Sequence, residues 1–241
     1  MPRNSSLKTI DGAILSRRSP QGRKPVISRD DLVEAALTLV GPHRSVSTLS
    51  LREVARQAGI APNSFYRQFR DMDELAVALI DRAGSSLREI IGNARQRALR
   101  ESSVVRASVQ TFMAQLRSDD KLLHILLREG TVGSPAFKAA VDRQLRFFEE
   151  ELRQDLERIA TATGSALHQP ATTAKAITRL VFAMGASIMD LPRERDAEVT
   201  EELVTMVRMI LQGAKALGAS HALGASRGRG ASRRRGARAE V

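Results

Sequence analysis

The chain has 241 residues, 42% of them hydrophobic and 27% charged, which suits a globular protein with one large domain or two smaller ones. It contains no cysteine, which excludes disulfides, thiolate nucleophiles and cysteine-bound zinc. With one tyrosine and no tryptophan, it also lacks the aromatic platforms that stack single-stranded nucleic acid. The most apolar stretch, residues 180–189, is too short for a bilayer, which takes about 20 residues, so we expect a cytoplasmic protein without membrane contact.

The net charge of +11 is concentrated at the two ends of the chain. Residues 1–70 carry 12 Lys/Arg against 5 Asp/Glu, and residues 214–241 carry 7 against 1, whereas the stretch between them carries 19 against 21. A neutral body with two basic ends favours a polyanionic partner held at particular places. The alternative is a charge pattern that serves solubility alone.

The N-terminal quarter predicts a basic arm followed by short helices. Residues 1–27 mix Ser, Gly, Pro and basic residues without periodicity, and we expect them to form a flexible arm. Ser28 is a suitable N-cap for a first helix, because apolar residues follow it at helical spacing until Gly41-Pro42.

Two further helices are predicted before residue 75. Ser50 and Glu53 form a capping box that begins one helix, and Gly59 ends it. Pro62 suits the first turn of the next helix, which the apolar spacing extends through Phe69. We therefore place a three-helix domain at residues 28–75.

From residue 76 to 217 nearly everything is expected to be helical. Amphipathic segments cover about residues 104–116, 122–128, 135–159, 171–190 and 197–217. No run of alternating β-branched residues appears, so we predict an all-α fold in which residues 76–217 form the larger domain. Residues 218–241 are rich in Gly, Ala, Ser and Arg, and we expect a disordered Arg-rich tail.

The pattern around Gly59 is typical of a helix-turn-helix. Such a unit needs small residues where its helices cross and a tight turn between them, and Ala55 and Gly59 fit these needs. Val54, Ile60 and Phe65 supply the apolar contacts. The second helix then exposes side chains that can bind base edges or phosphates, namely Asn63, Ser64, Arg67 and Gln68. The alternative is a plain helical hairpin with a polar outer face.

The same residues resemble the DNA-binding domain of TetR-family repressors over about residues 28–75. The resemblance rests on residues 50–61 (SLREVARQAGIA), 64–69 (SFYRQF) and 73–75 (DEL). Residues 60–71 (IAPNSFYRQFRD) and 126–129 (LLRE) are similar to one branch, the regulators of unsaturated fatty acid synthesis of the FabR and DesT type.

This resemblance implies roles for individual residues. Tyr66 and Gln68 would contact phosphates, and Asn63 and Ser64 would meet base edges. Pro62 removes one N–H donor from the start of the reading helix. The residues expected to fix the backbone at the start of the second helix are Thr48, Ser50 and Arg52.

The resemblance also implies a homodimer that binds a palindromic operator. In the family, the last two helices pair with those of a second subunit. The sequence agrees in that one stripe of the final helix is apolar, at Val199, Leu203, Met206, Val207, Ile210, Leu211 and Ala214. Gly185, Ala186 and Ser187 would permit close approach on the preceding helix. The alternative is that both helices bury these faces within one chain.

The branch resemblance implies a long-chain acyl-CoA as effector. The central helices carry apolar residues that would either fill a core or line an acyl tunnel: Phe112, Met113, Leu116, Leu123, Leu126, Leu127, Phe137, Val141, Phe148, Phe182 and Met184. Arg128 and Arg146 are candidates for binding the negatively charged coenzyme A portion at the mouth.

An enzyme is not expected. The four histidines show no metal-ligand spacing, no phosphate-binding loop is present, and Glu149-Glu150-Glu151 fits an exposed helix face. We predict a repressor of lipid metabolism genes, without a cofactor, that distinguishes unsaturated from saturated acyl chains. The rival interpretations are the same fold responding to a drug or metabolite, and an architectural DNA-binding protein.

Overall fold

The computed structural model describes residues 27–41, 44–98, 104–118 and 121–236, and only the backbone for residue 132 and residues 221–236. Within these ranges the regular elements are all helices, and no strand occurs beyond an isolated bridge between Gly41 and Arg44. The predicted all-α fold is confirmed. The predicted arm at residues 1–27 lies almost wholly outside the described residues.

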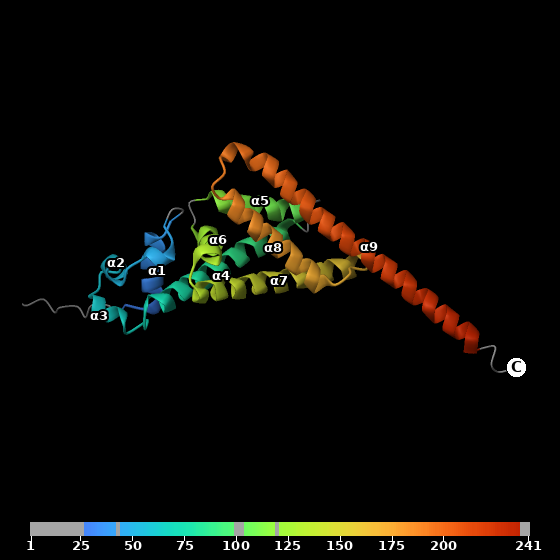
Figure 1. The fold of residues 1–241 in the computed structure, drawn as a ribbon, viewed down its shortest axis with the longest axis horizontal. Coiled ribbons are helices and arrows are strands. Elements are labelled where there is room, and N and C mark those ends of the chain that lie inside the picture. Colours follow the sequence, from blue (N-terminus) through green and yellow to red (C-terminus); the bar gives the residue numbers. More distant parts are fainter. Residues whose placement is uncertain (1–26, 42–43, 99–103, 119–120, 237–241) are drawn as a thin grey trace, which may run out of the picture.

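A small N-terminal domain contains α1 (Arg29–Leu39), η1 (Val46–Thr48), α2 (Leu51–Gln57) and α3 (Pro62–Phe65). Figure 1 shows these elements grouped at one end of the molecule. The predicted capping residues are confirmed, because Ser28 and Ser50 each form a capping box with the acid three residues later, Asp31 and Glu53.

Helix α3 is shorter than the sequence predicted. It ends at Phe65, and a tight turn carries the chain to Phe69 through bonds such as that from the Gln68 N–H to the Phe65 carbonyl, at 2.9 Å. Both phenylalanines are buried in the core, where their ring centroids lie 5.7 Å apart. Because residues four apart share one face of a helix, the apolar spacing through Phe69 fits this turn as well as a continuing helix.

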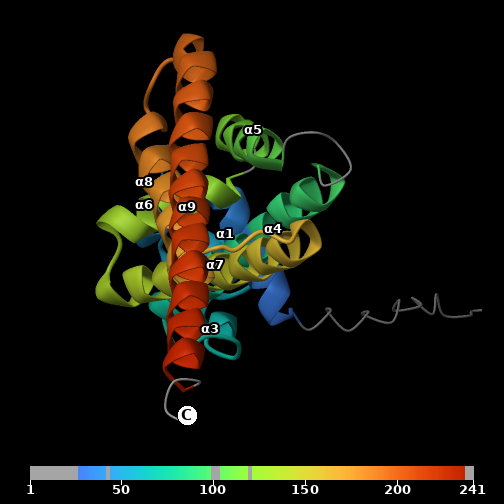
Figure 2. The same cartoon turned by 90° about the vertical axis from the view of Figure 1, so that its right-hand side faces the viewer.

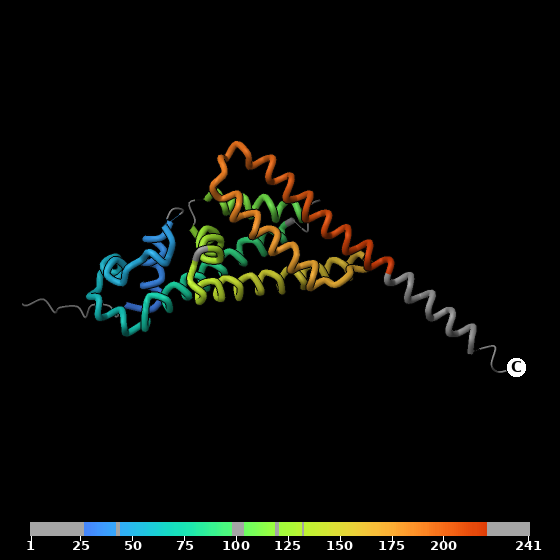
Figure 3. The backbone as a smooth tube through the Cα atoms, viewed as in Figure 1, coloured from blue at the N-terminus to red at the C-terminus, as the bar shows by residue number. Residues whose placement is uncertain are grey.

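Helix α4 (Met72–Ala98) joins the two domains without a break, as the trace in Figure 3 shows. Its first turns bury Leu75 and Leu79 in the N-terminal core, and α4 then continues into the larger domain. The predicted boundary between residues 75 and 76 therefore falls inside a continuous helix, because an apolar face can pass from one core to another without a change of period.

The larger domain contains the second half of α4 with α5 (Val104–Arg117), α6 (Leu122–Val132), α7 (Pro135–Thr163), α8 (Pro170–Ile188), η2 (Arg193–Arg195) and α9 (Asp196–Gly236). Helix α7 packs between α4 and α8, and α9 lies against α5 and α8. Figure 2 shows α9 running lengthwise past these neighbours. Gly164, in the left-handed conformation at φ 61°, is the C-cap that ends α7.

The prediction of a disordered tail from residue 218 is wrong for residues 218–236, because α9 continues to Gly236. The expectation rested on the lack of apolar surface to bury. Once a helix is nucleated by packed residues, however, each added residue needs only to propagate it, and Ala and Arg are among the strongest helix formers. Residues 237–241 lie outside the described part of the chain.

Candidate nucleic-acid interface and interior cavity

The helix-turn-helix has the geometry that its small residues predicted. Ala55 and Val54 are fully buried at the contact of α2 with α3, and the Ile60 N–H donates to the Ala55 carbonyl at 2.9 Å. Gly59, between the two helices, adopts φ +68°. This left-handed backbone conformation would be strained in a residue with a side chain. This turn connects α2 to α3, which pack against each other.

The outer face of α3 carries the expected DNA-contacting side chains. Pro62, Asn63 and Arg67 are exposed, Tyr66 is 61% exposed, and Ser64 is half-buried. Arg52 is exposed on the adjacent helix α2. The fold thus brings a hydrogen-bonding amide, a phenol and two cations onto one end of the molecule, while Phe65 anchors the same short helix to the core.

Gln68 has a structural role that sequence reasoning missed. Its side-chain amide nitrogen donates to the carbonyl of Ile27 at 2.9 Å, so Gln68 ties the turn after α3 to the residue before α1. Arg29 reinforces this corner by donating to the Gln68 carbonyl at 3.0 Å and lying 4.1 Å from the Phe69 ring centroid. A phosphate contact by Gln68 can use only the second amide hydrogen while this bond is kept.

Thr48 and Ser50 both hold the backbone next to α2. The Thr48 hydroxyl donates to the Ser45 carbonyl at 2.7 Å within η1, and the Ser50 hydroxyl accepts the Glu53 N–H as N-cap. Hydrogen bonds from Arg44, then from Ser50, lower the pKa of Glu53 to about 2. The start of α2 is therefore fixed by an ionised carboxylate over a wide pH range.

A cavity of about 440 Å³ lies inside the larger domain, among α4, α5, α7, α8 and α9. Its size is within the range of small-molecule sites, roughly 300–1,000 Å³. Three rings stand together in its wall, with the Phe182 centroid 5.8 Å from that of Phe112 and 5.2 Å from that of Phe148. Aliphatic side chains from all five helices complete the wall, among them Leu87, Ile91, Leu156, Ile177 and Leu211.

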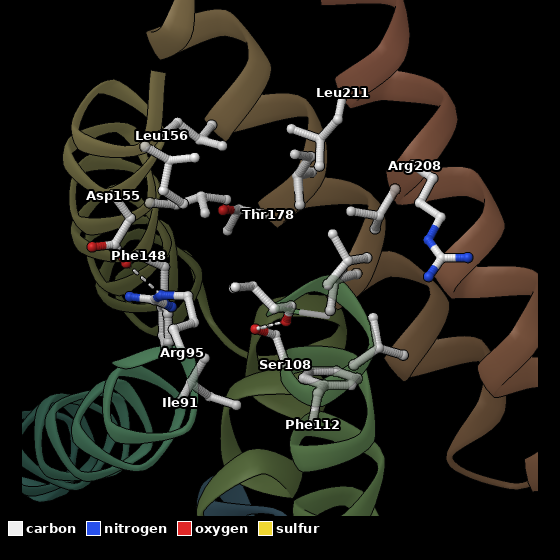
Figure 4. A pocket seen from close by; sticks show the side chains of 18 of the residues that line it. Ile91, Arg95, Ser108, Phe112, Phe148, Asp155, Leu156, Thr178, Arg208 and Leu211 are labelled. Carbon is white, nitrogen blue, oxygen red and sulfur yellow. Dashed lines mark hydrogen bonds and ion pairs between the residues drawn. The ribbon is translucent and has the colours of Figure 1, made fainter. Parts of the chain in front are cut away.

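Charged groups lie on two sides of this cavity. Arg95 is only 8% exposed and donates to Asp155 at 2.6 Å, so that ion pair is internally compensated. Arg208 and Lys215 are exposed residues of α9 that also line the cavity. Figure 4 shows Arg208 across the cavity from Arg95 and Asp155. The α9 side therefore offers positive charge next to an apolar interior.

Three of the thirteen predicted effector residues line this cavity: Phe112, Phe148 and Phe182. Most others are buried in the filled core, namely Met113, Leu116, Leu123, Leu126, Leu127, Phe137 and Val141, while Met184 is half-buried against that core. Helical spacing shows which residues face inward, but it cannot show where the interior is left unfilled. Arg128 and Arg146 do not line the cavity, and Arg146 is paired with Asp142.

The sequence contained a signal for Arg95 that was missed. Arg95 continues the apolar face of Leu87 and Ile91 at a step of four residues, so a charged residue stood where an apolar one was expected. Arg208 directly follows Val207 on α9 and is exposed, so the sequence contained no comparable signal for it.

The apolar stripe of α9 is largely used within the chain. Val199, Leu203, Val207 and Ala214 are buried, and Gly185 of α8 is packed against Phe112 rather than left open. Met209 and Leu217 of α9 remain 68% and 52% exposed. The expected subunit seam is therefore narrower than the sequence pattern suggested.

Neither a metal-binding cluster nor a membrane-spanning helix is seen among the described residues. In that part of the chain no three His, Asp or Glu side chains gather as metal ligands would. None of the helices described there is long and apolar enough to cross a membrane.

The N-terminal part of the chain matches a known family. Residues 32–79 match the model described as bacterial regulatory proteins, tetR family. This match covers α2, α3 and the turn between them, which are the elements that carry the exposed polar face.

Solved structures share the fold over about three quarters of this chain. Escherichia coli NemR in its reduced form is 21% identical with a TM-score of 0.61, over 76% of this chain and 97% of that one. Thermus thermophilus FadR, in complex with lauroyl-CoA, is 19% identical with a TM-score of 0.58, over 77% and 94%. AibR, in complex with isovaleryl coenzyme A and operator DNA, is 17% identical with a TM-score of 0.52, over 74% and 97%.

The match at residues 32–79 and the shared architecture agree with the geometry described above. The chain carries a TetR-family N-terminal domain with a helix-turn-helix, followed by a larger helical domain, in a TetR-like fold.

Proposed function

We propose that the chain is a sequence-specific DNA-binding transcriptional repressor that works in the cytoplasm. The observation that carries this proposal is the outer face of α3, where Asn63, Tyr66 and Arg67 are exposed while Phe65 is fully buried. Asn can bond adenine with two hydrogen bonds, and Arg can bond guanine or phosphate. A rigid core beneath such side chains is what base readout requires.

The protein acts as a homodimer that binds a palindromic operator. Two helix-turn-helix units are needed to read two half-sites about one helical turn apart. Met209 and Leu217, exposed on α9, support a second copy packing along this helix, because their apolar side chains would be removed from water in such a contact.

The effector is a long-chain acyl-CoA that enters the interior cavity. The three phenylalanine rings and the aliphatic wall suit a hydrocarbon chain, and Arg208 and Lys215 suit the negatively charged coenzyme A portion. These two α9 residues take the role that the sequence gave to Arg128 and Arg146. The FadR structure in complex with lauroyl-CoA and the AibR structure in complex with isovaleryl coenzyme A share this fold, which supports this class of ligand.

A cis double bond changes the shape that the cavity wall must fit, so the protein distinguishes unsaturated from saturated chains and controls lipid metabolism genes. The effector alters operator affinity only through its differential affinity for two arrangements of the dimer.

Selection from a random duplex library tests the DNA-binding proposal. The full chain should enrich a palindromic sequence and protect it in a sharp footprint. General coating of all duplexes would instead support an architectural protein. A response of the selected complex to an unrelated drug or metabolite, but to no acyl-CoA, would favour the other rival.

Calorimetric titration with palmitoyl-CoA and with coenzyme A alone tests the effector site. Ala160 lines the cavity, so Ala160→Phe should fill part of it and weaken binding of palmitoyl-CoA. Ala162 is exposed on the same helix, and Ala162→Phe should bind as the wild type does. Equal weakening in both variants would remove the cavity from the proposal.

A further inference from the structure

Glu129 of α6 is a buried carboxylate that reaches from the larger domain into the N-terminal domain. It is 1% exposed. Its Oε1 accepts two hydrogen bonds, from the Ser45 hydroxyl at 2.6 Å and from the Val46 N–H at 2.9 Å. Both donors belong to the start of η1, where Ser45 is the N-cap. The side chain of Glu129, which belongs to α6, therefore holds the start of η1 in the N-terminal domain.

Further hydrogen bonds connect Ser45 to the residues that precede α2. The Ser45 hydroxyl also accepts the Ser47 N–H at 3.1 Å, and the Ser45 carbonyl accepts the Thr48 hydroxyl at 2.7 Å. Two residues after η1, Ser50 caps α2, which carries Arg52. Displacement of Glu129 would thus also move the backbone from Ser45 to Ser50, which fixes the start of α2, the first helix of the helix-turn-helix.

A carboxylate is costly at this place, which indicates that its hydrogen bonds matter. Its second oxygen, Oε2, is buried and has no hydrogen-bond partner among the described residues, and an apolar side chain would avoid that penalty. A methyl at residue 133 would clash first with the Glu129 carbonyl oxygen, and it would also lie 2.9 Å from Phe137 Cβ and 3.1 Å from Oε2, so a glycine is needed beside Glu129. Simple packing between two domains does not require such an arrangement.

Helix α6 is also in contact with the wall of the interior cavity. Leu127, two residues before Glu129, and Phe112, which lines the cavity, both lie against Gly185 of α8. At the other end of α6, Lys121 donates to the Thr38 carbonyl of α1 at 3.2 Å. The helix therefore touches the N-terminal domain at two points and the cavity wall at a third.

We propose that Glu129 is a positioning residue for operator binding: through Ser45 and Val46 it fixes η1 and the start of α2 to α6. The operator part of this inference rests on the proposed function. Loss of the carboxylate loosens η1, lowers operator affinity and weakens the effect of a cavity ligand on that affinity.

Amide hydrogen exchange of the full chain, measured without DNA, tests whether Glu129 holds η1. Glu129→Ala should speed exchange of the Val46 amide about tenfold or more, because a hydrogen bond to a charged group is lost. Glu129→Gln keeps an oxygen at the position of Oε1 and should stay near the wild type. Glu157→Ala, which removes an exposed carboxylate from α7, is the matched control and should leave residues 44–52 unchanged.

Operator affinity of the same variants, measured on the duplex selected by the wild type, tests the positioning role. Glu129→Ala should bind about tenfold more weakly, with Glu129→Gln restoring most of the loss. Ser45→Ala should weaken binding in the same direction, and the double variant Ser45→Ala/Glu129→Ala should be little worse than Glu129→Ala alone, since both act through one contact.

Unchanged Val46 exchange in Glu129→Ala, additive effects of Ser45→Ala and Glu129→Ala, or equal acceleration of exchange throughout the chain would overturn the inference. The last outcome would show a general loss of stability. If the wild type selects no duplex, the proposed function fails, and the exchange data alone decide whether Glu129 holds η1.

Discussion

Gly185 of α8 faces the ring of Phe112 of α5 so closely that a methyl group at residue 185 would lie 2.6 Å from Cζ of Phe112. The ring lines the interior cavity on its other side. A small residue that the sequence assigned to close approach between subunits thus sets the position of an aromatic side chain within one chain.

Gly185→Ala should destabilise the protein by about 1–3 kcal/mol, because Phe112 must move in a packed interior. The displaced ring should also narrow the cavity and weaken binding of palmitoyl-CoA. Urea unfolding measures the first effect and calorimetric titration the second.

Gly92→Ala is the matched control for this substitution. Nothing lies within 4 Å of a methyl group at residue 92 of α4, so alanine should stabilise the helix by about 0.5–1 kcal/mol. Equal unfolding midpoints for the two variants would contradict the packing described for Gly185.

Glu53 should make the stability of the protein depend on pH in the acid range. Hydrogen bonds from Arg44 and Ser50 lower its pKa from 4.5 to about 2 in the folded state. Because the folded pKa is depressed, the stabilisation is fully present above about pH 4.5 and is lost as the pH falls toward 2. In thermal unfolding, the gap between wild type and Glu53→Gln should narrow over that range. A gap that stays constant from pH 7 to pH 2.5 would show that the hydrogen bonds do not favour the ionised form.

Asn63 and Tyr66 should differ in what their loss does to DNA binding. Asn63→Ala should relax the preference at one or two base pairs by about 1–3 kcal/mol, since base contacts specify sequence. Tyr66→Phe should weaken binding to all duplexes alike, since phosphate contacts position the protein. Repeating the library selection with each variant measures both effects. Asn93→Ala, an exposed position on α4, is the control, and an unchanged preferred site for Asn63→Ala would refute its role.

Arg52 and Arg67 should each contribute to the salt dependence of operator binding. Both are exposed on the helix-turn-helix, and each phosphate neutralised changes the log–log slope by about 0.9. Because a homodimer carries each residue twice, Arg52→Ala and Arg67→Ala should each flatten the slope by about twice that amount, whereas Arg82→Ala, exposed on α4, should not. A wild-type slope in either variant would place that residue away from phosphates.

The N-terminal domain could be predicted from the sequence because its signals are local. Ser28 and Ser50 cap helices through an acid three residues later, and Gly59 supplies a left-handed turn. Each of these depends on neighbours within a few residues. The C-terminal end of α3 was mispredicted. Phe65 and Phe69 pack in a core shared with residues of α1 and α4, and the local spacing of apolar residues does not describe that packing.

The cavity could not be predicted in the same way. Phe112, Phe148 and Phe182 were expected to face inward, and they do, but the empty volume beside them depends on five helices at once. The cations of α9 were missed because Arg208 and Lys215 look like ordinary exposed residues until α9 is placed beside the cavity. Long-range packing also decided that Gly185 faces Phe112.

The central claim is that acyl chain shape controls operator binding. It is tested most directly by titrating the labelled operator complex, followed by fluorescence anisotropy, with stearoyl-CoA and with oleoyl-CoA, which have chains of equal length. The account predicts unequal or opposite changes in operator affinity, and a loss of both responses in Ala160→Phe but not in Ala162→Phe. Identical curves for the two ligands, or no response to either in the micromolar range, would contradict it.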